Sequence, residues 1–233
     1  MFTIKLAGHI FGVENEFPYV EMLCADYIFE GPAELIVRIS EEERKAEDPK
    51  RAGYSEDYLE SLAVYRKISE WLIMRDVLLF HASALMVDGK AFLFLAPSGV
   101  GKSTHARLWR EYFGERVVMI NDDKPLIGIQ GDGVWAYGTP YGGKHHLQTN
   151  CRGKVYGLIW LKRGEKNKIC RLTEENAFAK CIKNVYHPQD GKKWGKVLDL
   201  VKRITKLPCY EMTCNISREA VKVAIEGLKE EII

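Results

Sequence analysis

Residues 91–104 read Ala91-Phe92-Leu93-Phe94-Leu95-Ala96-Pro97-Ser98-Gly99-Val100-Gly101-Lys102-Ser103-Thr104, and no other segment constrains the architecture as strongly. The apolar run 91–95 predicts a short buried strand, and 104–113 predicts a helix that stops at Gly114. Between them, 96–104 fits the pattern (Ala/Gly)-x-x-x-x-Gly-Lys-(Ser/Thr) of a phosphate-binding loop. Such a loop gathers backbone N–H groups at the positive end of a helix dipole, where a di- or triphosphate binds.

The loop pattern also predicts a role for each of its residues. Lys102 would reach the outer phosphates, and the hydroxyl of Ser103 would hold Mg²⁺. The alternative is a plain glycine turn with an exposed lysine, but the flanking strand and helix favour the phosphate loop. The expected nucleotide-binding residues are Ser98, Gly99, Val100, Gly101, Lys102, Ser103 and Thr104.

An acidic pair follows the next predicted strand, 117–120. Asp122 and Asp123 would stand at the carboxyl end of that strand, the edge where ligands gather in α/β sheets. One carboxylate together with Ser103 suits Mg²⁺, and the other can accept a proton from an attacking hydroxyl. The alternative is a solvated turn.

Two further groups are candidates for the same chemistry. His81 precedes the loop strand, and the glycine-rich segment 138–146 presents Lys144, which could stabilise charge on a transferring phosphoryl group. The alternatives are a hydrogen-bonded core histidine and a hairpin with solvated cations. Asn150 and Arg152 are candidates for the same loop. Segment 186–194 is a candidate substrate-contacting loop. We expect His105 and His187 in surface or loop positions, without a role in the site.

The composition limits the classes of protein to which the chain can belong. The 233 residues are 46% hydrophobic and 28% charged, as in ordinary soluble domains, and no apolar run is long enough to cross a membrane. The opening segment lacks a secretory pattern and the six cysteines form no Cys-x-x-Cys pair, so we expect reduced thiols in the cytoplasm. The alternative is a zinc site or a set of disulfides. Residues 1–80 carry 16 Asp/Glu and 9 Lys/Arg (−7), whereas 144–206 carry 16 Lys/Arg and 5 Asp/Glu (+11). The basic half favours an acidic partner or a lysine-rich solvated face, and no nucleic-acid motif accompanies it.

The rest of the chain predicts an α/β fold in two parts. We expect an N-terminal strand and helix lobe over 1–76, packed on a core over 77–233. The expected strands are 2–6, 19–23, 35–39, a single run at 77–87 that pairs with 91–95 through the turn Asp88-Gly89, 117–120, 126–130, 134–137 and 155–161. The expected helices are 55–74, with Ser55 as its cap, and 218–229, capped by Ser217, while 41–53 reads as a loop or frayed helix.

Together, His81-Ala82-Ser83-Ala84, the loop 96–104 and Asn121-Asp122-Asp123 resemble the catalytic core of HPr kinase/phosphorylase, whose P-loop fold is shared with ATP-dependent phosphoenolpyruvate carboxykinase. The resemblance covers roughly 77–145 and implies a mixed sheet of that type. It also implies Asp122 as general base with His81 beside it, Asp123 and Ser103 as metal ligands, and Lys102 with the loop amides on ATP, although the two aspartates could exchange roles. The chain lacks the family's separate N-terminal domain and its Glu-Ile-Arg-Gly-type signature, so it looks more like the small stand-alone members.

These residues predict an ATP-dependent kinase that transfers a phosphoryl group to a hydroxyl of a peptide, a protein or a small molecule, with acidic acceptors among the candidates. GTP remains an alternative nucleotide, and the sequence leaves the oligomeric state open. The alternative function is a nucleotide-binding module or NTPase switch without a dedicated acceptor. We expect neither nucleic acid nor a membrane as partner.

Overall fold

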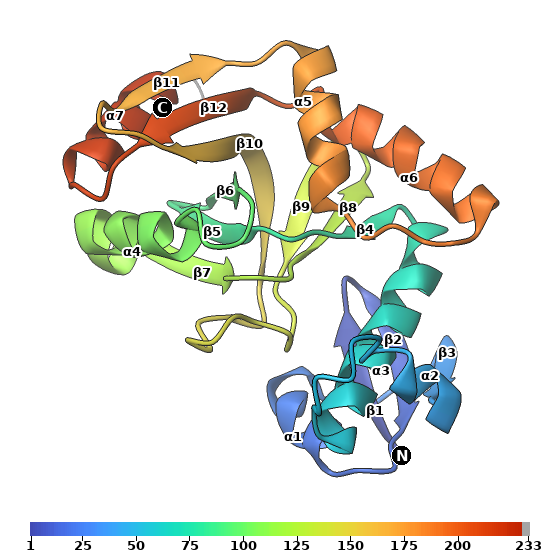
Figure 1. Ribbon diagram of the computed structural model, residues 1–233. Helices are drawn as coiled ribbons and strands as arrows, with labels where there is room; N and C mark the ends of the chain where they lie inside the picture. The colour runs from blue at the N-terminus through green and yellow to red at the C-terminus, as the bar shows by residue number, and fades with distance from the viewer. Residues whose placement is uncertain (230–233) are drawn as a thin grey trace. The chain divides into compact units, whose positions relative to one another are not determined.

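Strand β6 (Lys90–Leu95), the glycine loop (residues 96–101) and helix α4 (Lys102–Phe113) follow one another in the computed structural model as the sequence predicts (Figure 1). Helix α4 begins two residues earlier than expected and ends at Gly114, whose φ is 60°. The structure describes residues 1–229, and the chain divides into two compact units, Met1–Val77 and Leu78–Ile233. The fold class is mixed α/β.

The first unit contains a three-stranded sheet of order β1-β2-β3 and several helices. Strands β1 and β2 are antiparallel, β2 and β3 are parallel, and helix α3 buries Leu59, Val64, Ile68 and Leu72. Its elements are β1 (Phe2–Leu6), β2 (His9–Glu14), α1 (Tyr19–Leu23), the 3-10 helix η1 (Ala25–Tyr27), β3 (Leu35–Arg38), α2 (Glu41–Lys45) and α3 (Glu56–Ile73).

One expectation for this unit is wrong, and one of its strands was not expected. Segment 19–23 is helix α1 rather than a strand, and 9–14 is a strand that the pattern did not indicate. Pro18, with a φ of −71°, suits a helix start, and Val20 is buried there, so local packing overrides the β propensity of the segment. Ser55 occupies the N-cap position of α3, but its side chain makes no capping hydrogen bond.

The second unit contains a nine-stranded mixed sheet. Its main path runs β4-β8-β9-β10-β6-β5-β7, and β12 pairs with β10 and β11. Its remaining elements are β4 (Val77–Leu79), β5 (Ser83–Val87), the 3-10 helix η2 (Gly114–Arg116), β7 (Val117–Asn121), β8 (Leu126–Gln130), β9 (Gly133–Tyr137), β10 (Arg152–Arg163), β11 (Lys168–Arg171), α5 (Glu174–Cys181), the 3-10 helix η3 (Ile182–Asn184), α6 (Gly191–Ile204), β12 (Cys209–Cys214) and α7 (Glu219–Gly227).

Strand β10 joins the two parts of this sheet. Its first residues pair with β9 in antiparallel fashion, and Leu158–Arg163 pairs with β12 in parallel. It also runs parallel to β6, with Leu95 opposite Trp160. The carboxyl ends of β6, β10 and β12 therefore meet at one edge, where the glycine loop begins.

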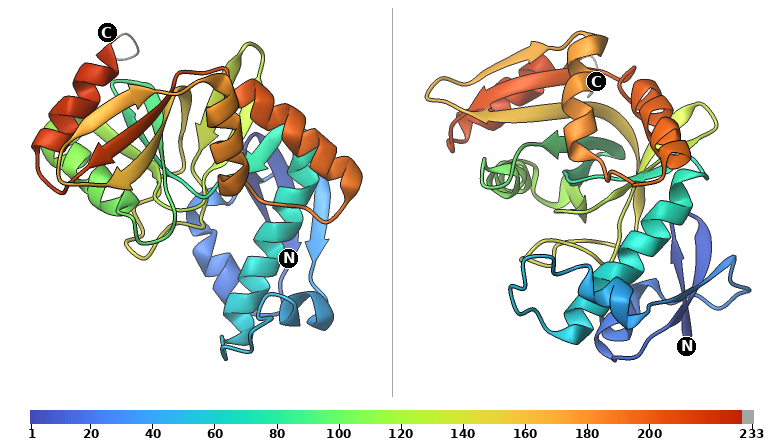
Figure 2. Two further views of the ribbon diagram at one scale, coloured as in Figure 1. Left: turned by 45° about the horizontal axis from the view of Figure 1, so that its top comes forward. Right: turned by 45° about the vertical axis from the view of Figure 1, so that its right-hand side comes forward.

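Apolar side chains fix the helices on the sheet. Trp109 of α4 is fully buried against Phe92 and Phe94 of β6, and α7 adds Val221 and Ala224 to the same cluster. In both views of Figure 2, α4 (green) and α6 (orange) lie on opposite sides of this unit. Helix α6 buries Val197, Leu200, Val201 and Ile204.

The single strand expected at 77–87 is wrong, because β4 and β5 are separated by Phe80–Ala82. The backbone N–H of Phe80 donates to Pro125 O, that of His81 to Asn184 O at 2.7 Å, and that of Ala82 to Asp123 O. The antiparallel pairing of β5 with β6 is confirmed. The break places His81 two residues before the start of β5, the strand that pairs with the loop strand β6.

The last helix differs in its cap. Helix α7 lies within the expected 218–229, but the hydroxyl of Ser217 donates to Asn215 Oδ1 at 2.6 Å instead of capping the helix. Within residues 1–229, no helix combines the length and the apolar composition that crossing a membrane requires.

Candidate active site

The glycine loop delivers the start of α4 to the edge of the sheet. Gly101 precedes the helix with a φ of 122°, a conformation that L side chains rarely adopt, so glycine is needed there. The first amides of a helix have no intrahelical acceptor and point outward with the positive end of the dipole. Loop and helix together therefore form a site that suits an anion.

Lys102 lies at the centre of this site and is 8% exposed. Its Nζ donates to Ala96 O at 3.1 Å and lies 3.1 Å from His81 Nε2. Burial lowers the pKa of Lys102 below its ordinary value, against the raising effect of the charge of Asp123. The ammonium group is thus held by a carbonyl and an imidazole at the base of the loop.

His81 contacts Asp123, with Nε2 3.3 Å from Oδ1. Burial alone would raise the pKa of Asp123, but the hydrogen bond with His81 and the charges of His81 and nearby lysines lower it below its ordinary value. The structure places His81 against Asp123, whereas the resemblance implied His81 beside Asp122. The two aspartates therefore have different partners, His81 for Asp123 and the backbone of Gly143 for Asp122.

Asp122 is held by a different segment. It is 4% exposed, and its Oδ1 accepts a hydrogen bond from the backbone N–H of Gly143 at 2.6 Å. A Cβ on Gly143 would lie 2.7 Å from Asp122 Oδ2, so the close approach of this loop to the carboxylate requires glycine. Buried Asn121 fixes the turn, because its Oδ1 accepts from the backbone N–H groups of Asp123 at 2.8 Å and Lys124 at 2.7 Å.

These groups line one cavity of about 660 Å³, here called the phosphate cavity. Of the predicted site residues it brings together His81, Ser98, Gly99, Gly101, Lys102, Ser103, Thr104, Asp122, Asp123 and Lys144. Val100 lies in the same loop but does not line this cavity. The exposed side chain of Lys144 lies at the 138–146 loop, as the sequence suggested.

Sequence reasoning missed several lining residues. Arg107 and Arg110 of α4 line the phosphate cavity, as do Met119 and Leu147. His145, in the 138–146 segment that the sequence indicated, lines it as well. Ser103, Arg107 and Arg110 are spaced four and three residues apart, so one helix face carries all three. That spacing is the signal that could have revealed the two arginines.

Other candidates lie elsewhere. Arg152 donates to Gln130 Oε1 at 3.2 Å and lies over the Trp135 ring, and neither it nor Asn150 lines the phosphate cavity. The tract 186–194 is also absent from it, and α6 already begins at Gly191. His105 is a core residue, 2% exposed, rather than a surface one.

The oxygen donors at this site fit Mg²⁺ only when a phosphate is present. Among residues 1–229, no group of three or more His, Cys, Asp or Glu side chains could hold a metal ion. The Ser103 hydroxyl and the Asp123 carboxylate line the same cavity, and Mg²⁺ is commonly bound by one or two such oxygens together with phosphate and water. These two residues would hold the ion.

Matches with known proteins come from solved structures alone. No protein-family model and no curated protein matches the chain. A solved structure, the Hpr(Ser) kinase/phosphatase from Coxiella burnetii, is similar at a TM-score of 0.35 and 13% sequence identity, over 65% of this chain and 97% of that chain. A likeness this remote carries no argument about residues or activity, which therefore rest on the site itself.

Proposed function

We propose that this chain is an ATP-dependent kinase that transfers the γ-phosphoryl group to a hydroxyl acceptor, with Mg²⁺. The observation that carries the proposal is one juxtaposition: Lys102, His81 and the acidic pair Asp122-Asp123 line a single cavity at the amino end of α4. Cations and the N–H groups at a helix start can bind phosphate oxygens, and a nearby carboxylate can accept the proton of an alcohol.

The phosphates would lie on the glycine loop. The outer phosphates would meet Lys102, and the amides at the start of α4 would surround them. Arg107, Arg110 and Lys144 add positive charge around the same cavity, where charge on the transferring group would be stabilised. ATP is the proposed nucleotide and GTP the alternative.

The two aspartates would have different roles. Asp123, whose pKa is lowered, stays ionised and would hold Mg²⁺ with Ser103; the ion, when bound, neutralises phosphate charge. Asp122 would accept the proton of the acceptor hydroxyl. The oxygen of that hydroxyl then bonds to the γ-phosphorus, the bond from phosphorus to the β–γ bridging oxygen breaks, and ADP leaves with the electron pair.

The proposal is tested by following the label of γ-labelled ATP in the presence of Mg²⁺. The protein is incubated with pools of small hydroxy compounds and of peptides, alongside Asp122→Asn as a matched variant of the same size. A kinase gives label in an acceptor with the wild type and far less with the variant. Label that appears only as free phosphate under every condition would instead indicate an NTPase switch.

A further inference from the structure

A second cavity, of about 630 Å³, is lined in part by Ala96, Pro97 and Val100 of the glycine loop and is rich in cations. We name it the basic cavity. Its charged side chains are Lys162, Arg163, Lys180 and Lys183, and its apolar side chains include Pro97 and Trp160. No Asp or Glu lines it, whereas the phosphate cavity contains both aspartates.

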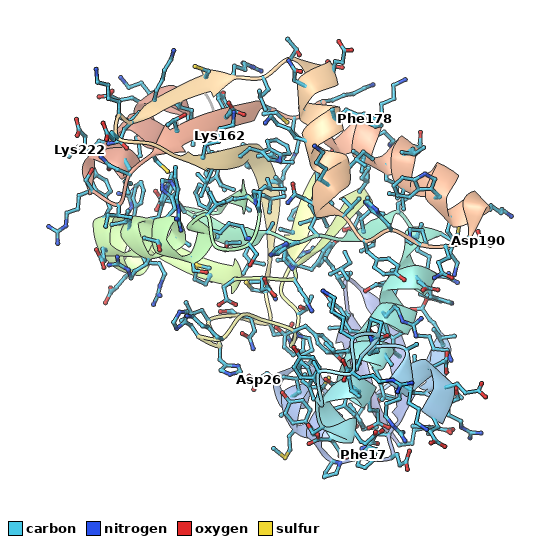
Figure 3. All side chains as sticks on the ribbon, viewed as in Figure 1. Phe17, Asp26, Lys162, Phe178, Asp190 and Lys222 are labelled. Atoms are coloured by element: carbon cyan, nitrogen blue, oxygen red, sulfur yellow. The ribbon has the colours of Figure 1, made fainter. Side chains whose placement is uncertain are left out.

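The basic cavity lies where α/β sheets bind ligands. Lys162 and Arg163 end β10 just beyond Trp160, which pairs with Leu95 at the end of the parallel strand β6. Helix α5 and the 3-10 helix η3 bring Lys180 and Lys183 to the same place. Figure 3 labels Lys162 on the sheet and Phe178 on α5. Ligands of open α/β sheets bind at the carboxyl ends of the strands.

The charge of this cavity is only partly compensated. The Glu211 carboxylate pairs with both Lys162 and Lys180, each at 2.6 Å. Arg163 donates to the loop carbonyls of Gly99 and Val100, which are uncharged. Lys183 has no ion pair within residues 1–229. The four cations of the cavity are therefore compensated by one carboxylate, that of Glu211, which leaves a charge balance of +3.

His81 connects the two cavities. Among the described residues it is the one that lines both. Asn184 holds it in place: the Asn184 carbonyl accepts from the His81 N–H at 2.7 Å, and the Asn184 side chain accepts from the Trp160 indole at 3.1 Å. A molecule in the basic cavity would thus lie one side chain away from Lys102 and Asp123.

We propose that the basic cavity binds the phosphoryl acceptor, and that this acceptor is a small hydroxy compound carrying a phosphate or carboxylate group. The inference rests on the proposed function and names the substrate class of the same site. The volume is within the range of small-molecule pockets, roughly 300–1,000 Å³. A nucleobase is uncharged and would leave the four cations without a role.

The anion would pair with Lys183 and its neighbours, while the hydroxyl of the same molecule points past His81 to the γ-phosphorus. The hydroxyl proton goes to Asp122 and ADP is the leaving group, as in the step described above. Binding of the anion at this place would orient the attacking oxygen.

Binding is tested first without turnover, with inorganic phosphate as the probe. The indole N–H resonance of Trp160, assigned with Trp160→Phe, is followed during the titration. We expect a saturable shift in the wild type that persists in Lys102→Ala, where the glycine loop has lost its lysine.

The affinity for phosphate should fall about tenfold or more in Lys183→Glu, because an ionic hydrogen bond is lost and a negative charge, of the same sign as the phosphate, is introduced. Lys206→Glu, an exposed site that lines neither cavity, should behave as the wild type.

The absence of a saturable shift would overturn the inference, and so would equal affinity in Lys183→Glu or loss of the shift in Lys102→Ala. An outcome of the last kind would assign the phosphate to the glycine loop instead.

Turnover then separates this inference from the proposed function. With γ-labelled ATP, glycerol 3-phosphate and glycerate are compared with uncharged glycerol. We expect transfer to favour the charged compounds, and Lys183→Glu to raise their KM about tenfold or more without changing nucleotide affinity. Transfer to uncharged acceptors or neutral peptides that Lys183→Glu does not affect would overturn the inference and leave the kinase intact. Phosphate binding in the basic cavity without transfer to any acceptor would count against the kinase instead.

Discussion

His81 Nε2 lies 3.3 Å from Asp123 Oδ1, and the same nitrogen lies 3.1 Å from Lys102 Nζ. One nitrogen cannot serve both partners in the same way. It accepts from Lys102 only while unprotonated, and it donates to Asp123 only while it carries a proton. The position of one proton therefore decides whether the imidazole supports the loop lysine or the carboxylate.

This relationship predicts the effect of His81→Gln. Since His81 lowers the pKa of Asp123, its removal should raise that pKa, because burial then acts against fewer opposing groups. Titration of the Asp123 carboxyl carbon by NMR measures the change. His187→Gln, at a residue that packs on Trp194 outside the phosphate cavity, is the control. An unchanged Asp123 titration in His81→Gln would contradict the pairing.

The two aspartates should respond differently to amide substitution. Asp122→Asn should leave nucleotide affinity near that of the wild type and reduce turnover by roughly 10²-fold or more, a common contribution of a general base. Asp123→Asn should instead raise the Mg²⁺ concentration that half-saturates activity. Steady-state kinetics over a range of Mg²⁺ concentrations distinguishes the two. If the variants exchanged these behaviours, the roles of the two acids would be reversed.

Gly143→Ala tests the approach of the 138–146 loop to Asp122. The added Cβ would lie 2.7 Å from Asp122 Oδ2, so the loop or the carboxylate must move, and turnover should fall. Gly195→Ala is a matched control, because a Cβ there meets nothing within 4 Å and the residue lies inside α6. It should raise the free energy of unfolding by about 0.5–1 kcal/mol and leave turnover unchanged. Equal turnover of Gly143→Ala and wild type would show that this contact does not matter.

His105 predicts a pH dependence of stability. Burial lowers its pKa to about 4, whereas the unfolded chain binds the proton near pH 6.5. Below pH 6.5 the unfolded state therefore holds more protons, and the free energy of unfolding should fall by about 3 kcal/mol between pH 6.5 and 4. Urea denaturation across this range should give a shallower slope for His105→Gln than for wild type. Identical slopes would contradict a buried neutral imidazole.

Local patterns predicted the centre of the second unit well. The strand, loop and helix at 90–113, the hairpin at 126–137 and the pairing of β5 with β6 all follow from apolar runs and turn residues close in sequence. Segment 19–23 was mistaken for a strand because β-prone residues form α1 when packing around Val20 demands it.

The long-range contacts could not be predicted from the sequence. Arg163 reaches the carbonyls of Gly99 and Val100 across more than sixty residues, and Asn184 anchors His81 across 103. Nothing in the local pattern of either segment indicates its partner, because only the order of strands in the sheet brings them together. The basic cavity could not be predicted for that reason.

The most direct test of a triphosphate site at Lys102 is calorimetric titration of the protein with ATP in the presence of Mg²⁺. We expect saturable binding at one site per chain, strongly weakened in Lys102→Ala and retained in Asp122→Asn, with Lys168→Ala on the exposed strand β11 as the control. Lys102→Ala that binds ATP as tightly as the wild type, or a wild type that binds none, would contradict the account.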